Sequence, residues 1–224
     1  MTAEEYKREE YILDTSISTN QTTLMILELM KMAALSFKKY LAFGYHAKQN
    51  LNEPDLSQTY LQQATKLIRH FDYPFNIDKE YQDIYYGSDG FSDLYFYTNE
   101  EDKSNVSIFS IECKRLPAPE KNREKEYVIG DKNNGGIERF KTEKHGKGLA
   151  ECGMIGFVEK ENFDYWQQKI NSWIIELSKN NTDWNSNEIL VEIEQTTDFM
   201  QLNSIAQRAV STNLTLYHLW INTF

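Results

Sequence analysis

Apolar residues in the first third of the chain recur every three or four positions, the period of one face of an α-helix. This pattern predicts one helix between residues 18 and 44 and another from Ser57 to Phe71. The candidate N-caps of the first helix are Ser18, Thr19 and Asn20, and Gly44 is its expected end. Its apolar face carries Leu24, Leu27, Met30, Ala34 and Leu41. The second has Leu61, Ala64, Ile68 and Phe71 on its apolar face and Asp55 or Ser57 as its cap. A methionine stripe on the first helix favours core packing over docking of a partner helix.

From residue 81 onwards the pattern changes to β-branched and aromatic residues, which are typical of strands. Three strands are expected at residues 81–87, 92–98 and 106–116, separated by a turn at 88–90 and a polar loop at 99–105. Two prolines end the third strand, and a charged loop follows it.

Helical and strand patterns alternate in the remainder of the chain. Helices are expected at residues 137–144, 163–179 and 204–210, and strands at 152–159, 189–196 and 214–224. The sum is an α/β fold of the mixed α+β kind, with a mixed central sheet flanked by helices.

Composition narrows the class of protein. A chain of 224 residues can bury a substantial core without covalent staples. Cys113 and Cys152 are too few for a disulfide framework or a four-cysteine zinc site, and they fit a reducing compartment, so a cytoplasmic protein is expected. The start of the chain is acidic and polar, and no stretch approaches about 18 uninterrupted apolar residues, so no membrane span is expected.

The charge of the chain is unevenly distributed. A formal net charge of -10 argues against a protein that coats nucleic acid nonspecifically. Residues 103–147, however, hold 11 Lys and Arg against 7 Asp and Glu, which gives +4. This locally basic segment is either a solvated loop of mixed charge or a surface for an anionic partner.

The second and third expected strands form a hairpin over residues 87–116. Antiparallel pairing around a loop centred near residue 102 makes the numbers of opposed residues sum to about 204 or 205, so Asp93 faces Glu112. Alternation along the strand then puts Lys114 on the same face as Glu112. Two carboxylates and one ammonium group therefore converge on a small patch.

Two carboxylates facing each other across strands repel, so their juxtaposition indicates a bound cation. Oxygen donors favour Mg²⁺ or Mn²⁺, held by Asp93, Glu112 and the backbone carbonyl of Cys113. Such an ion activates water, and Lys114 beside it can orient that water or stabilise phosphoryl oxygens. The tripeptide Glu-x-Lys occurs three times in the chain, so the alternative is a surface ion pair, with Asp93 merely ending a turn.

Asp93, followed by Ile-Glu-Cys-Lys-Arg at residues 111–115, resembles the core motif of the PD-(D/E)XK nucleases, the restriction-endonuclease-like superfamily. By this resemblance Asp93 and Glu112 take the metal-ligand positions and Lys114 the position of the catalytic lysine. Many members have an acidic residue near the first core helix that assists the metal. Here the residues matching that place loosely are Glu53 and Asp55. The usual proline before the aspartate is replaced by Ser92.

The sequence has no internal repeat, low-complexity tract or obvious linker, so a single domain is expected, and the resemblance covers only its core. A restriction-endonuclease-like catalytic core is expected over about residues 51–160, within a single nuclease-like domain spanning 1–224. Residues 1–50 are expected to form an N-terminal helical appendage. Residues 161–224 supply a helix and strands that complete the sheet.

Basic residues follow the motif along the chain. Arg139, Lys141 and Lys144 are the candidates for contact with a nucleic-acid backbone, and a solvated helix face balanced by acidic residues is the alternative. His145 has no partner that the sequence indicates. His218 lies in an apolar run and is expected in the core.

The expected function is therefore that of a Mg²⁺-dependent endonuclease hydrolysing phosphodiester bonds, with DNA preferred to RNA as the substrate. Its resemblance to genome-defence nucleases suggests a bacterial restriction or anti-phage system, with action as a homodimer or within a larger defence complex. The alternative is a catalytically inactive module of the same fold that binds a protein partner. The net charge of -10 and the methionine-bearing first helix motivate that alternative.

Overall fold

The computed structural model describes residues 19–43, 51–82, 90–100 and 106–224. Its helices are α1 (Thr19–Ala42), α2 (Glu53–Phe71), α3 (Gly136–Lys141) and α4 (Phe163–Asn180), with short 3₁₀ turns at Lys121–Arg123 and Ser186–Glu188. Its strands are β1 (Phe75–Gln82), β2 (Phe91–Thr98), β3 (Phe109–Leu116), β4 (Glu151–Val158), β5 (Val191–Gln195), β6 (Phe199–Ala206) and β7 (Leu214–Asn222). No helix within these residues is long and apolar enough to span a bilayer.

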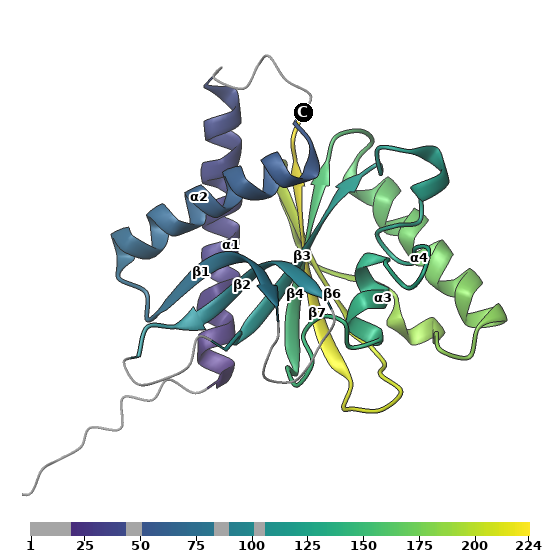
Figure 1. The fold of residues 1–224 in the computed structure, drawn as a ribbon. Coiled ribbons are helices and arrows are strands. Elements are labelled where there is room, and N and C mark those ends of the chain that lie inside the picture. The colour runs from purple at the N-terminus through teal and green to yellow at the C-terminus, as the bar shows by residue number, and fades with distance from the viewer. Residues whose placement is uncertain (1–18, 44–50, 83–89, 101–105) are drawn as a thin grey trace, which may run out of the picture.

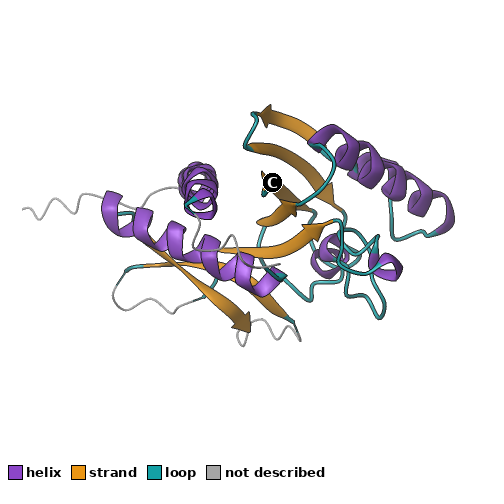
Figure 2. Ribbon diagram, turned by 90° about the horizontal axis from the view of Figure 1, so that it is seen from above, coloured by secondary structure: helices purple, strands orange, loops and turns teal. Residues whose placement is uncertain are grey.

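The strands form one mixed sheet in the order β1-β2-β3-β4-β7-β6-β5 (Figure 1). Neighbours pair in parallel from β3 through β4 to β7, and antiparallel at both ends of the sheet. Helices α1 and α2 cover one face, and α3 and α4 lie against the other (Figure 2). The expected mixed sheet flanked by helices is confirmed.

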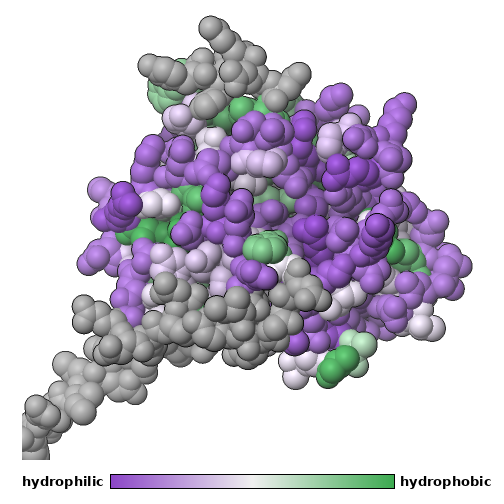
Figure 3. Space-filling view, viewed as in Figure 1, coloured by the Kyte–Doolittle hydropathy of each residue, from purple (hydrophilic) through white to green (hydrophobic). Residues whose placement is uncertain are grey.

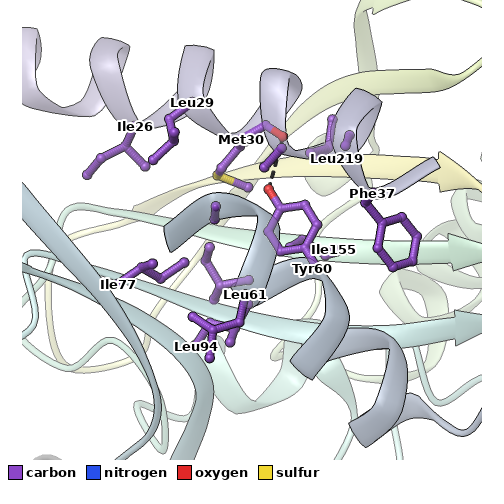
Figure 4. Close-up of a cluster of buried hydrophobic side chains, with 14 of the residues drawn as sticks. Ile26, Leu29, Met30, Phe37, Tyr60, Leu61, Ile77, Leu94, Ile155 and Leu219 are labelled. Carbon is purple, nitrogen blue, oxygen red and sulfur yellow. Dashed lines mark hydrogen bonds between the residues drawn. The ribbon is translucent and has the colours of Figure 1, made fainter. Parts of the chain in front are cut away.

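Alternating side chains of the central strands pack into two apolar cores, one on each face of the sheet. Ile111 and Ile155 point towards α1 and α2, whereas Met154 and Trp220 point towards α4. In the first core the Tyr60 hydroxyl donates a hydrogen bond of 3.0 Å to a backbone carbonyl of α1 (Figure 4). This bond satisfies a polar group among side chains that exclude water. The surface visible in Figure 3 is mainly hydrophilic, with scattered apolar side chains.

The apolar face predicted for α1 is right in part. Met30 and Ala34 are buried, and the other two methionines of α1 pack against the same core, as expected. Leu24, however, is 57% exposed, because the helix buries the face that carries Ile26 instead. Thr19 already belongs to the helix, whereas the predicted cap at residue 18 and the stop at 44 lie outside the described residues.

Helix α2 begins earlier than predicted. Its N-cap is Asn52, which forms a reciprocal capping box with Asp55, so the predicted caps at Asp55 and Ser57 are wrong. Phe71, predicted to face inward, is also exposed, since the helix ends there. The early start matters for function because it puts Glu53 in the first turn of the helix, held in a fixed position.

The hairpin register agrees with the prediction. Leu94 pairs with Ile111 and Phe96 with Phe109, so opposed numbers sum to 205. The strand expected at 81–87 begins instead at Phe75, and the remainder of that prediction, from 83 onwards, lies outside the described residues.

The C-terminal region corrects one predicted element. Residues 204–210, predicted as a helix, instead continue strand β6 as far as Ala206 and then form a loop. These residues form a strand because Ser204 and Ile205 pair with β7. The even-numbered apolar residues of β6 pack in the core on the α4 side of the sheet. The other predicted elements after residue 136 are present, with ends shifted by a few residues.

Candidate active site

Asp93 and Glu112 lie side by side on the antiparallel strands β2 and β3. The pairing of Leu94 with Ile111 fixes this juxtaposition. The Cys113 backbone N–H donates a hydrogen bond of 2.7 Å to Asp93 Oδ2. The sequence register therefore brings together the two carboxylates as predicted.

Glu112 is fully buried and surrounded by basic side chains. Its Oε1 accepts hydrogen bonds from Lys114 Nζ at 2.7 Å and from an Arg139 guanidinium nitrogen at 2.6 Å. His145 Nδ1 lies 3.0 Å from Glu112 Oε2, close enough for electrostatic attraction, although the two atoms lack the geometry of a hydrogen bond. Burial by itself raises the pKa of Glu112, but Lys114, His145 and Arg139 outweigh it and lower the pKa to about 2.

Three oxygens surround the Lys114 ammonium group. Besides Glu112 Oε1, Nζ donates to the Cys113 carbonyl at 2.8 Å and to Glu53 Oε1 at 3.2 Å. Burial opposes the charged form of Lys114, but Glu112 and Glu53 favour it more strongly and raise its pKa. Lys114 is therefore a fixed cation at neutral pH.

Glu53 reaches the site from the first turn of α2, whereas Asp55 does not. Glu53 Oε2 accepts a hydrogen bond of 3.1 Å from the Arg115 backbone N–H, so the carboxylate bridges α2 and β3. Burial raises the pKa of Glu53, and the nearby Glu112 raises it further. Asp55 is occupied in the helix cap. Of the two acidic residues suggested by the sequence, the structure brings only Glu53 to the site.

Asp93 differs from the other carboxylates of the site. Throughout the described ranges, no Lys, Arg or His nitrogen lies within ion-pair distance of it. Burial, followed by the charge of Glu112, raises the pKa of Asp93 to about 7, against the opposing effects of Lys114 and the Cys113 N–H. This carboxylate would gain from a cation that the described residues do not supply.

The donors of the site have the chemistry of a Mg²⁺ site. Within the residues that the structure describes, no three His, Cys, Asp or Glu side chains are arranged to hold a metal. Mg²⁺ commonly takes only one or two carboxylates and completes its shell with other oxygens and water. Asp93, Glu112 and the Cys113 carbonyl supply oxygens alone, and no basic side chain among the described residues pairs with Asp93. These three groups fit the ion by donor type and charge.

The three basic residues predicted to contact nucleic acid have separate locations. Arg139 reaches Glu112, whereas Lys141 points into the protein and pairs with the buried carboxylate of Glu188 at 2.6 Å. Burial lowers the pKa of Lys141, so its environment is unsuited to a solvent-facing phosphate contact. Lys144 donates to two backbone carbonyls, one of them that of Asn133 at 3.0 Å. Only Arg139 of the three therefore joins the site.

His145 is the site residue that the sequence did not indicate. Its ring packs edge-on against Phe140 and closely against the backbone at Gly90. A Cβ at Gly90 would lie 2.5 Å from the Lys144 carbonyl oxygen and 2.6 Å from the His145 ring, so this position requires glycine. His218, in contrast, is a core residue as predicted, bonded to two buried hydroxyl groups.

Two clefts flank the cluster. A small one of about 120 Å³ is lined by Glu53 and Asp93, together with residues of α2 and β1. A larger one of about 510 Å³ is lined by Arg139 and the loop that follows β3. Glu53 and Asp93 thus line the smaller cleft and Arg139 lines the larger one, while Glu112 is buried.

Comparison with protein-family models, curated proteins and solved structures finds no match to the chain.

Proposed function

We propose that the protein is a Mg²⁺-dependent endonuclease with a restriction-endonuclease-like core, hydrolysing phosphodiester bonds in DNA. One observation carries the proposal. Asp93 and Glu112 lie on adjacent strands, with Lys114 on the face of Glu112, and in the described part of the chain no basic side chain lies within ion-pair distance of Asp93. Glu53 completes the group from helix α2.

The order of elements supports the proposed core. Helix α2 precedes three antiparallel strands, and α3 and the parallel strand β4 follow. This is the order expected for restriction-endonuclease-like proteins, with the candidate site at the junction of β2, β3 and α2. The preference for DNA over RNA, the defence role and assembly into a homodimer or larger complex follow from the resemblance alone.

Each side chain would have a distinct task. Asp93, Glu112 and the Cys113 carbonyl would hold Mg²⁺, which when bound lowers the pKa of a water molecule and neutralises charge on the phosphoryl group. Because Lys114 is a fixed cation, it serves as a hydrogen-bond donor to the attacking water or to a phosphoryl oxygen, and not as a general base. Glu53 orients the Lys114 ammonium group.

Cleavage assays with Mg²⁺ or Mn²⁺ on duplex and single-stranded DNA and on RNA test the proposal. We expect metal-dependent cleavage that Lys114→Ala and Glu112→Ala abolish, while circular dichroism shows both variants folded. Lys121→Ala, at an exposed position, is the control and should cleave normally. Absence of cleavage by the parent protein on every substrate would count against the proposal.

A specific observation favours the alternative of an inactive, partner-binding module. The Lys114 ammonium group already occupies the place among the oxygens of Glu53, Glu112 and Cys113 that a cation would take. Calorimetric titration with Mn²⁺ separates the two functions. A nuclease should bind the ion in a manner that Asp93→Ala weakens, whereas an inactive module should show no such affinity.

A further inference from the structure

Arg139 donates to one of the two oxygens through which Glu112 could bind a cation. Its guanidinium group donates to Glu112 Oε1 at 2.6 Å, and Lys114 Nζ donates to that oxygen at 2.7 Å. The other oxygen, Oε2, is buried against His145. Oε1 of Glu112 is therefore occupied by two basic side chains, while the buried Oε2 accepts no hydrogen bond among the described residues, so a cation can reach Oε1 only if one of the two withdraws.

Of these neighbours, Arg139 is the one that can withdraw. Its side chain is 26% exposed, compared with 7% for Lys114 and 1% for His145. Arg139 also lines the cleft of about 510 Å³, whereas Lys114 and His145 do not. Rotation of the arginine into the cleft would leave the rest of the cluster in place.

The cleft has the chemistry to receive an anion beside Arg139. Besides Arg139, its wall contains the amide side chains of Asn122 and Asn134, the basic side chains of Arg123 and Lys125, and the acidic side chains of Glu126 and Asp131, so basic groups outnumber acidic ones. Those two basic residues already pair with Glu126 and Glu176, so Arg139 is the member whose acidic partner belongs to the candidate site. A guanidinium group binds a phosphate through two parallel hydrogen bonds and so can exchange a carboxylate for a phosphodiester.

We propose that Arg139 couples phosphate binding to metal binding. In the free protein Arg139 neutralises Glu112 and weakens its affinity for a divalent cation. A backbone phosphate in the larger cleft draws the guanidinium group away and makes Glu112 available to the ion. This inference rests on the proposed function and adds a regulatory step to it, in which the substrate promotes loading of the metal.

Coupling by Arg139 predicts a change in metal affinity that loss of a residue acting only in phosphate binding would not produce. Loss of a residue that only binds substrate would leave the metal affinity of the free protein unchanged. Loss of Arg139 should instead increase this affinity, because a competitor is removed while Lys114 still neutralises Glu112. Reciprocity requires that the metal and the nucleic acid strengthen each other's binding in the parent protein, and less so without Arg139.

The test is calorimetric titration with Mn²⁺ in the absence of nucleic acid, using the parent protein and Arg139→Met. Arg123→Met, which changes the same cleft without touching Glu112, is the matched control. We expect Arg139→Met to bind Mn²⁺ about tenfold more tightly than the parent, and Arg123→Met to bind like the parent. Arg139→Gln, which keeps a neutral donor, should show a smaller increase and serves if the methionine variant does not fold.

A second measurement uses fluorescence anisotropy of a labelled duplex with uncleavable phosphorothioate linkages. Mn²⁺ should tighten duplex binding by the parent several-fold more than by the Arg139 variant. Unchanged or weaker Mn²⁺ affinity in a folded Arg139 variant overturns the coupling and leaves the nuclease proposal standing. Absence of Mn²⁺ binding in the parent and both variants overturns the metal site, and with it the coupling. Binding seen only once Arg139 is removed supports both.

Discussion

Asp93→Asn isolates the free-energy cost of burying the Asp93 charge in the folded protein. The amide oxygen of asparagine can still accept the hydrogen bond from the Cys113 N–H, so the substitution removes the charge and keeps the shape. Because Asp93 has no ion-pair partner among the described residues, its charge should destabilise the metal-free protein. We therefore expect Asp93→Asn to increase the free energy of unfolding, at the expense of function.

The variant should be more stable because the pKa of Asp93 is about 7 in the folded protein, compared with an ordinary value of 3.8. Between these values the folded state retains a proton that the unfolded state has released, so parent stability falls as pH rises from about 4 to about 7. At about 1.4 kcal/mol for each pH unit, the full difference corresponds to about 4 kcal/mol. Solvent at the small cleft screens part of this, and we expect a gain of about 2 kcal/mol at pH 8.

Urea unfolding of metal-free protein at several pH values measures this effect. The difference between Asp93→Asn and the parent should be near zero at about pH 4 and should reach its maximum near pH 8. Asp78→Asn, an exposed position on the neighbouring strand, is the control and should show no comparable rise. A variant less stable than the parent at pH 8, or a difference independent of pH, would refute the reasoning. Saturating Mn²⁺ should stabilise the parent more than the variant.

Three other substitutions test contacts around the site by thermal or urea unfolding. Gly90→Ala forces a Cβ against the Lys144 carbonyl and the His145 ring and should cost about 1 to 3 kcal/mol of stability; a neutral effect would show that the contact is not tight. Lys141→Met leaves Glu188 buried without its partner and should cost about 3 kcal/mol, most of which should return when Glu188→Leu is added; no recovery in the double variant would contradict this account. Asn52→Ala removes the cap of α2 and should cost about 1 kcal/mol, and it should also lower cleavage, because that cap positions the helix turn carrying the acidic residue of the site.

Local rules sufficed to predict the centre of the candidate site. Strand alternation puts Glu112 and Lys114 on one face, and the loop position sets the register that brings Asp93 opposite Glu112. Both rules depend on residues close in the chain, and the structure agrees with them. The apolar periodicity likewise located the main helices, because each must bury one face.

Partners distant in the chain required the tertiary structure. Arg139 and Lys141 stand two residues apart on the short helix α3, yet one reaches Glu112 and the other Glu188. Helix geometry points side chains two positions apart in different directions. Only the packing of α3 decides that one direction leads to Glu112 and the other to Glu188. His145 joins the site through tertiary packing as well, because its ring lies close to Gly90, the residue before β2.

The sequence by itself thus determined which face of the hairpin carries the carboxylates and the lysine, since side-chain alternation is a property of the strand. Only the tertiary structure decided that Glu53 completes the group, because the first turn of α2 meets β3 and brings this carboxylate within 3.2 Å of Lys114 Nζ. It also decided that residues 204–206 form a strand, since pairing with β7 outweighs a local pattern that suits a helix. Periodicity in the sequence specifies which face of a helix or strand carries a residue, and tertiary packing specifies which residues that face contacts.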